Sequence, residues 1–263
     1  MPSAYFYDIS RADLSVTARR VAQIIFIGIA LLFASFVFFY SSFMKKTISF
    51  DKTLSSPLLR RAQDVFNDVY DKHIPSCYSH SNASVYHSNC YGFVNFLLYD
   101  VYPEAYIEIQ NAMETLKDEV PPSVDGKPCP FNYSAALKKL DLSCWEVLTD
   151  LSEVFPGDIL IYLPLNFKPK KTFKIGERPP SVHMMIVEKV VSSHKGTYHF
   201  SIIDCTRVPH NRIDDTRYPK RNGIGRSSVF LKEWRKEYLL QWSPRGKSLK
   251  REIVGARLKH PLQ

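Results

Sequence analysis

Hydrophobic residues are concentrated near the start of the chain. Residues 21–43 read VAQIIFIGIALLFASFVFFYSSF, 23 residues with no charge and one amide, Gln23. A helix rising about 1.5 Å per residue would span roughly 34 Å over this segment, enough to cross a bilayer core. The apolar part of a cleaved signal peptide is shorter, about 7–15 residues, and is followed by small residues rather than by aromatic residues and lysines. The pattern predicts an uncleaved transmembrane helix.

The charges beside this segment indicate its orientation only weakly, because three cationic residues lie before it and three after it: Arg11, Arg19, Arg20, Lys45, Lys46 and Lys52. A short tail before a single helix usually stays in the cytoplasm. We therefore expect a single-pass protein of the inner (cytoplasmic) membrane whose C-terminal part lies on the periplasmic, extracytoplasmic side. The expected organisation is a cytoplasmic tail over 1–20, the transmembrane helix over 21–43, a juxtamembrane linker over 44–60 and one domain over 61–263.

Within that domain, helical patterns come first and strand patterns second. Helices are predicted over Ala62–Tyr70, Cys90–Val101 and Tyr106–Leu116, and prolines between residues 121 and 130 predict a loop. Strands are predicted over Asp158–Leu163, Val182–Val191, Thr197–Asp204, Ser228–Leu231, Tyr238–Trp242 and Glu252–Leu258, with a hairpin turn within Ser192–Gly196. Helices followed by a run of antiparallel strands are typical of an α+β domain.

Three polar residues occupy positions suited to nucleophilic catalysis. Cys90 opens the best predicted helix directly after Asn89, a good N-cap residue, so its thiol lies where the helix dipole and free N–H groups favour a thiolate. The same N–H groups could stabilise an oxyanion. His183 opens one strand and Asp204 ends the next, so the hairpin makes them neighbours. Taken singly, such residues are usually a buried thiol, a surface imidazole and a turn carboxylate. Together they match a nucleophile, a base and a group that orients the base.

Four motifs, covering roughly residues 75–260, resemble NlpC/p-sixty peptidases. Residues 89–94 (NCYGFV) resemble the family's D-C-S-G-F-V motif, residues 155–160 (FPGDIL) its P-G-D strand, residues 182–187 (VHMMIV) the strand that bears the base, and Ile203-Asp204 the place of the third polar residue. The resemblance implies a papain-like, NlpC-type α+β domain with the triad Cys90, His183 and Asp204. It also implies a substrate-contacting tyrosine at Tyr78, although Tyr86 is an alternative.

The sequence departs from the family motif on both sides of the thiol. Asn89 replaces the family's aspartate and keeps the capping role without its negative charge, and Tyr91 replaces a serine and adds bulk beside the pocket. A second, looser pattern runs from Asp204 through His210, Asp214, Asp215 and Arg217 to Arg226 and resembles poorly described bacterial relatives of cell-wall hydrolases. It indicates either a polar loop held near the cleft by Arg217–carboxylate pairing or an ordinary charged surface loop.

These features predict a membrane-anchored thiol hydrolase that cleaves amide bonds. The resemblance implies that the bonds are those of peptidoglycan stem peptides. The oxyanion and substrate contacts are expected from Asn89, Tyr78 and Tyr91, without cofactor or metal. A non-catalytic binding module on the same fold and a cysteine-dependent acyltransferase remain alternatives, and the oligomeric state stays open.

Charge and cysteine content add two expectations. The chain has 35 Lys and Arg against 26 Asp and Glu, a net charge of +9, which suits an acidic polymer; no nucleic-acid recognition motif accompanies it. A lysine-rich stretch over 168–178 precedes His183 and could attract such a polymer. Apart from Cys90, the four cysteines could form two disulfides, remain reduced or, less plausibly, bind zinc: Cys77, Cys129, Cys144 and Cys205.

Overall fold

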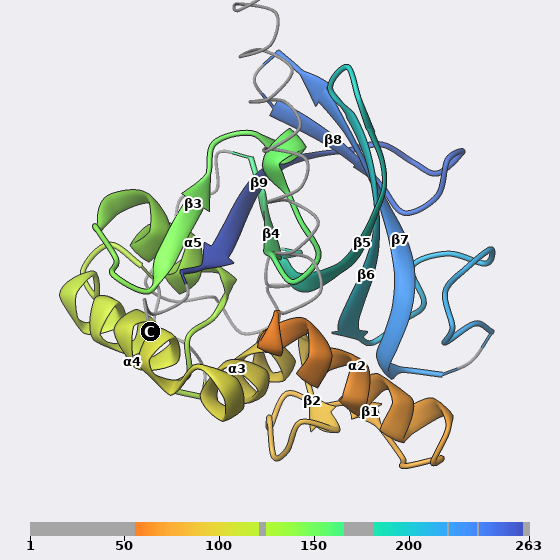
Figure 1. Ribbon diagram of the computed structural model, residues 1–263, viewed down its shortest axis with the longest axis horizontal. Helices are drawn as coiled ribbons and strands as arrows, with labels where there is room; N and C mark the ends of the chain where they lie inside the picture. Colours follow the sequence, from red (N-terminus) through yellow and green to blue (C-terminus); the bar gives the residue numbers. More distant parts are fainter. Residues whose placement is uncertain (1–55, 121–124, 166–180, 220, 236, 260–263) are drawn as a thin grey trace, which may run out of the picture. The chain divides into compact units, whose positions relative to one another are not determined.

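The structure is a computed structural model that describes residues 56–120, 125–165, 181–219, 221–235 and 237–259 (Figure 1). Residues 55–263 form one compact unit. Its elements are, in chain order, α2 (Pro57–Tyr70), β1 (Cys77–Tyr78), β2 (His87–Ser88), α3 (Cys90–Val101), α4 (Pro103–Thr115), α5 (Pro130–Lys139), β3 (Trp145–Leu148), the 3-10 helix η1 (Leu151–Glu153), β4 (Ile159–Pro164), β5 (His183–His194), β6 (Thr197–Thr206), β7 (Gly223–Trp234), β8 (Glu237–Gln241) and β9 (Leu249–Leu258).

The main sheet closes on itself. Its strand order is β3-β9-β4-β5-β6-β7-β8, and β8 also pairs with β9, so six antiparallel strands form a closed barrel with β3 added outside. The predicted papain-like α+β fold is therefore wrong, although the helices α2 to α5 do precede the strands of the main sheet as expected. Local sequence patterns identify strands, but closure also requires β9 to pair with β4, which lies far from it in the chain. Ile159 pairs with Ala256, and no local pattern reveals such a pairing.

Apolar side chains fill both faces of the barrel wall. Alternate residues of each strand point to opposite faces, and the buried residues accordingly divide into two clusters. Met185, Val187 and Ile202 belong to the smaller cluster, within the barrel. Met184, Ile186 and Ile203 belong to the larger one, which includes the apolar residues of the helices. Because both faces are covered, these strands read as continuous hydrophobic runs rather than as alternating ones.

The helices cover one side of this barrel (Figure 1). The predicted helix Cys90–Val101 has the bounds of α3, because Asn89 caps its first turn and Tyr102 ends it before Pro103. The other two predicted helices correspond to α2 and α4, which begin earlier, at Pro57 and Pro103. A proline is tolerated in a first helical turn because the N–H that it lacks would have no intrahelical acceptor there.

Five elements have no counterpart in the sequence prediction: α5, β3, the two-residue strands β1 and β2, and η1. Pro130 was assigned to a loop, but it begins α5. Strand β3 pairs with the edge of β9 that lies opposite β4; Trp145, for example, pairs with Leu258. The six predicted strands correspond to β4 through β9, and the predicted hairpin turn is formed by Lys195 and Gly196, both with positive φ, as a tight turn between twisted strands requires.

The expected membrane anchor requires a correction. Within the described ranges, none of the helices has the length and apolar character needed to cross a bilayer. The segment predicted as the anchor, 21–43, lies outside the described residues. So do the tail, the part of the linker before residue 56 and the whole lysine-rich stretch 168–178. The structure therefore gives no support to a single-pass membrane protein with a periplasmic domain, and neither the anchor nor that localisation is retained.

Candidate active site

Strand register brings His183 and Asp204 to the same end of the barrel. Strands β5 and β6 are antiparallel, and Ile186 pairs with Ile203. Asp204 is thus diagonal to His183 on the same face of the sheet, at a separation that side chains can bridge. His183 Nε2 is hydrogen-bonded to Asp204 Oδ2, and both residues are buried. The predicted pairing of base and orienting carboxylate is present.

A second imidazole shares that carboxylate. His210 comes from the loop between β6 and β7, and its Nε2 lies 2.6 Å from Asp204 Oδ2. The His183 and His210 rings meet edge to face, with centroids 5.2 Å apart. One carboxylate oxygen therefore accepts a hydrogen bond from each of two histidines.

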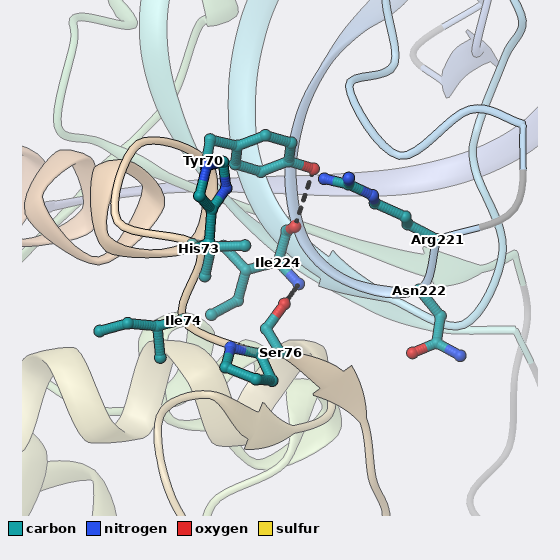
Figure 2. A pocket seen from close by; sticks show the side chains of 9 residues that line it. Tyr70, His73, Ile74, Ser76, Arg221, Asn222 and Ile224 are labelled. Atoms are coloured by element: carbon teal, nitrogen blue, oxygen red, sulfur yellow. Dashed lines mark hydrogen bonds between the residues drawn. The ribbon is translucent and has the colours of Figure 1, made fainter.

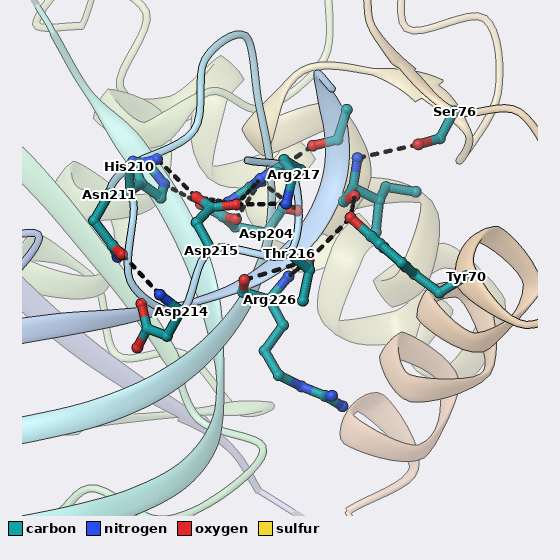
Figure 3. Close-up of polar contacts among 12 residues, drawn as sticks. Tyr70, Ser76, Asp204, His210, Asn211, Asp214, Asp215, Thr216, Arg217 and Arg226 are labelled. Atoms are coloured by element: carbon teal, nitrogen blue, oxygen red, sulfur yellow. Dashed lines mark hydrogen bonds and ion pairs between the residues drawn. The ribbon is translucent and has the colours of Figure 1, made fainter. Parts of the chain in front are cut away.

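The other oxygen of Asp204 faces a buried arginine. Arg217 Nη1 lies 2.7 Å from Asp204 Oδ1, and Arg217 also donates twice to Asp215, through Nε at 2.9 Å and Nη2 at 3.0 Å (Figure 3). Asp215 Oδ2 in turn accepts from the backbone N–H of His210 at 2.7 Å. Of the two interpretations of this loop, the Arg217-held polar loop is confirmed, because Arg217 has no exposed surface.

These contacts determine the charge of Asp204. Burial alone would raise the pKa of the carboxyl group, but Arg217, His210 and His183 outweigh it and hold the pKa of Asp204 well below its ordinary value. Burial alone would lower the pKa of the Arg217 guanidinium, but the carboxylates of Asp204 and Asp215 outweigh burial and raise this pKa. The pair is therefore ionised at neutral pH.

Cys90 occupies the first turn of α3, at a helix start that several side chains hold in place. Asn89 Oδ1 accepts from the Gly92 N–H at 2.8 Å, and the Asn89 N–H donates to Asn82 Oδ1 at 2.9 Å. The N–H groups of Cys90 and Tyr91 have no intrahelical acceptor at this position. Asn89 is thus confirmed as the cap, and the helix start offers donors near the thiol.

The electrostatic environment of His183 includes Cys90. Burial opposes a charge on His183, but the negative charge that Cys90 can carry, the Asp204 carboxylate and hydrogen bonding to these side chains outweigh burial and raise the pKa of His183 well above its ordinary value. Since Nε2 of His183 is bonded to Asp204, Nδ1 is the nitrogen left for Cys90. The three predicted catalytic residues therefore come together, in the order thiol, imidazole, carboxylate.

The two tyrosines proposed as substrate contacts have different neighbours. Tyr78 is half-buried, and burial together with the negative charge that Cys90 and Cys205 can carry raises the pKa of its hydroxyl. Burial also raises the pKa of Tyr91, whose hydroxyl has Asn89 and Asn82 as hydrogen-bonding partners. Tyr78 thus lies in the electrostatic field of the thiol, whereas Tyr91 is engaged with the capping asparagines.

Aromatic rings surround the two histidines. Trp242 stacks on His210 with ring centroids 3.6 Å apart and an interplanar angle of 5°. Trp242 and Tyr162 also approach the His183 ring, with centroids 6.0 and 5.7 Å from it. These rings limit access of water to the imidazoles and to Asp204.

The same cluster has the composition of a metal site. The ligand atoms of His183, Asp204 and His210 lie within 4.8 Å of one another. However, both imidazoles contact the carboxylate directly, and Arg217 places a fixed positive charge on its other oxygen. This arrangement favours hydrogen bonding over metal ligation. The five cysteines form no disulfide, and Cys205, buried beside Asp204, donates to the Ser88 carbonyl at 3.0 Å.

Comparisons with protein-family models, with curated proteins and with solved structures find no match to this chain. The site is therefore interpreted from its own geometry. The sequence predicts roles for Cys90, His183 and Asp204, but none for His210 or Trp242. The available signal for His210 was its place in one polar loop with Asp204 and Arg217; Trp242 offered none, because its contact with His210 joins different parts of the chain.

Proposed function

We propose that this protein is a thiol hydrolase that cleaves amide bonds, with Cys90 as nucleophile, His183 as acid and base, and Asp204 as the group that orients the imidazole. The observation that carries the proposal is the hydrogen bond of the His183 ring to a buried, ionised carboxylate, together with the contribution of Cys90 to the raised pKa of that ring. A buried imidazole between a thiol and a carboxylate is the arrangement that activates cysteine nucleophiles.

In the proposed reaction the Cys90 thiolate attacks the carbonyl carbon of the amide. The N–H groups at the start of α3 stabilise the resulting oxyanion, assisted by the Tyr78 hydroxyl. The imidazolium of His183 then gives its proton to the leaving nitrogen, so the C–N bond breaks and a thioester to Cys90 remains. A water molecule, deprotonated by His183, attacks the thioester, releases the carboxylic acid and restores the thiol–imidazole pair.

Peptidoglycan stem peptides are the proposed substrate class. This part of the proposal depends on the motif resemblance around Cys90, His183 and Asp204 rather than on the geometry of the site. The net charge of +9 supports it, because stem peptides and the polymers associated with them carry carboxylates.

One observation favours a second candidate, a binding module without catalysis. Only 5% of the Cys90 surface is exposed. Such a thiol would meet a substrate carbonyl only if neighbouring side chains move. In this case the same contacts would serve the stability of the barrel end rather than a reaction.

The two candidates differ in the reactivity of Cys90. As a thiol hydrolase, the protein should react with iodoacetamide at Cys90 at neutral pH, and His183→Gln should slow this reaction. Cys90→Ala should abolish hydrolysis of muropeptides with the fold intact, whereas Cys129→Ala, which removes another poorly exposed thiol, should leave hydrolysis unchanged. Absence of labelling, or turnover that survives in Cys90→Ala, would reject the nucleophile and favour the binding module.

A further inference from the structure

A separate polar cavity lies between the end of α2 and the start of β7. Its volume is about 380 Å³, and its polar wall is formed by Tyr70, His73, Ser76, Arg221 and Asn222, with Ile224 beneath them. Figure 2 shows these side chains arranged around one space, with the Arg221 guanidinium next to the Tyr70 hydroxyl. We call this space the Arg221 cavity. None of its residues belongs to the proposed triad.

The wall of the cavity is rich in hydrogen-bond donors. Ser76 Oγ accepts from the Ile224 N–H at 3.3 Å, so its own hydroxyl hydrogen remains available. Asn222 Oδ1 accepts from the Tyr78 N–H at 3.0 Å, which leaves the two amide hydrogens of Asn222 for another acceptor. A ligand that presents acceptor oxygens would match this wall.

The cavity also contains an arginine without a carboxylate partner. Arg221 lies 5.9 Å from the Tyr70 ring centroid, and the salt bridges among the described residues do not include it. Tyr70 lies in the field of two arginines, Arg217 and Arg221, and of one carboxylate, Asp215. Arg217 is already paired with Asp204 and Asp215, so the unbalanced positive charge near Tyr70 is that of Arg221.

We propose that the Arg221 cavity binds a small ligand through an anionic group, either a carboxylate or a phosphate. An unpaired guanidinium offers two parallel donors, which fit the oxygens of both groups, and the neutral donors of Ser76 and Asn222 complete the contacts. The cavity volume falls within the range of about 300–1,000 Å³ that is usual for small-molecule sites. The inference does not depend on Cys90 being a nucleophile.

Two main-chain links connect this cavity to the candidate active site. The Arg221 N–H donates to the Arg217 carbonyl at 2.8 Å, and Arg217 holds Asp204. Asn222 holds the backbone of Tyr78, whose side chain lies near the thiol. A ligand bound by Arg221 and Asn222 therefore contacts the two segments that lead to Asp204 and to Tyr78.

Calorimetric titration of the full chain tests the proposal, with inorganic phosphate and glutarate as probes at constant ionic strength. We expect saturable one-to-one binding of at least one probe, and Arg221→Gln should weaken it by about tenfold or more. The matched control is Arg235→Gln, because Arg235 is another exposed arginine that lies over an aromatic ring, that of Trp234. This control should bind as the wild type does.

A second variant keeps the test valid if Arg221→Gln fails to fold. Asn222→Asp retains an oxygen that can accept from the Tyr78 N–H but replaces the amide donors with negative charge, so it should abolish binding. Binding of phosphate alone or of glutarate alone would identify the anionic group. Absence of saturable binding for both probes, or equal affinity of Arg221→Gln or Asn222→Asp and the wild type, would overturn the proposal.

Discussion

Replacing Arg217 with glutamine tests the buried charge network directly. The guanidinium makes two contacts to Asp215, one to Asp204 Oδ1 and one to the Gly223 carbonyl at 3.1 Å, and neither Arg217 nor Asp204 is exposed. Glutamine leaves the buried carboxylate of Asp215 without its counter-charge and deprives Asp204 of the fixed charge on its Oδ1. Breaking a buried ion pair in this way costs about 3–5 kcal/mol, a large part of the roughly 5–15 kcal/mol that stabilises a typical domain.

Urea unfolding at pH 7, followed by circular dichroism, measures this loss. With a slope of about 2 kcal/mol per molar urea, the expected change lowers the midpoint by roughly 2 M. The control is Arg212→Gln, because Arg212 belongs to the same loop and is exposed, with its guanidinium over the Tyr218 ring. That substitution should change the free energy of unfolding by less than about 0.5 kcal/mol.

The pH dependence gives an independent check. The pKa of Asp204 is depressed in the folded protein, so its contribution to stability is present above the unfolded value, near 3.8, and is lost as the pH falls through the lower folded value. Without Arg217 the Asp204 carboxyl group should take up a proton at a higher pH than in the wild type. The unpaired negative charge that destabilises the variant is then removed at a pH where the wild type still has its ion pair. The stability gap should therefore be largest at neutral pH and narrow in acid. A variant as stable as Arg212→Gln at pH 7 would refute the network.

Three further predictions concern the imidazole of His183, the start of α3 and the tryptophan that stacks on His210. In the proposed reaction the proton of His183 must reach the leaving group, and the pKa of His183 is raised. The rate of amide hydrolysis should therefore fall at alkaline pH, with an apparent pKa above the ordinary histidine value. A pH–rate profile without this fall would contradict the role of His183. In Gly92→Ala the added methyl group would overlap the Asn82 side chain, so the hydrogen bond that the Asn89 N–H donates to Asn82 Oδ1 should be lost. The free energy of unfolding should fall by about 1–2 kcal/mol, measured as a lower melting temperature. An unchanged melting temperature would show that this hydrogen bond does not stabilise the helix start. Trp242→Ala should expose the His210 ring and raise the pKa of His210, since burial is the largest cause that lowers this pKa. An NMR titration of the His210 ring protons that shows no rise in pKa would exclude Trp242 as the source of that burial.

The sequence predicted the elements that local rules determine. The bounds of α3 follow from a capping asparagine, apolar residues at helical spacing and a proline just after the helix. The hairpin between β5 and β6 follows from two runs of β-branched and aromatic residues around a glycine-containing turn. Since His183 and Asp204 lie on these two strands, their proximity could be predicted as well.

Features that depend on distant contacts could not be predicted in the same way. Barrel closure requires the last strand, β9, to pair with β4, which precedes it by about a hundred residues, as well as with its neighbour β8, and this pairing changes the fold class. The stacking of Trp242 on His210 also joins residues from different parts of the chain. Helix α5 was missed for a local reason: the prolines before it were taken as breakers, although Pro130 stands where a helix tolerates one.

The site contains two histidines on one carboxylate oxygen, and their different environments separate their roles. The negative charge that Cys90 can carry and the carboxylate of Asp204 outweigh burial at His183 and raise its pKa well above the ordinary value. At His210, burial together with the charges on His183 and Arg217 lowers the pKa, although Asp204 acts against this. His210 is therefore neutral and serves as a hydrogen-bond donor to Asp204. Its bond fixes the carboxylate without adding a second proton that could compete with His183, so in the proposed reaction His183 is the ring that exchanges a proton with the sulfur.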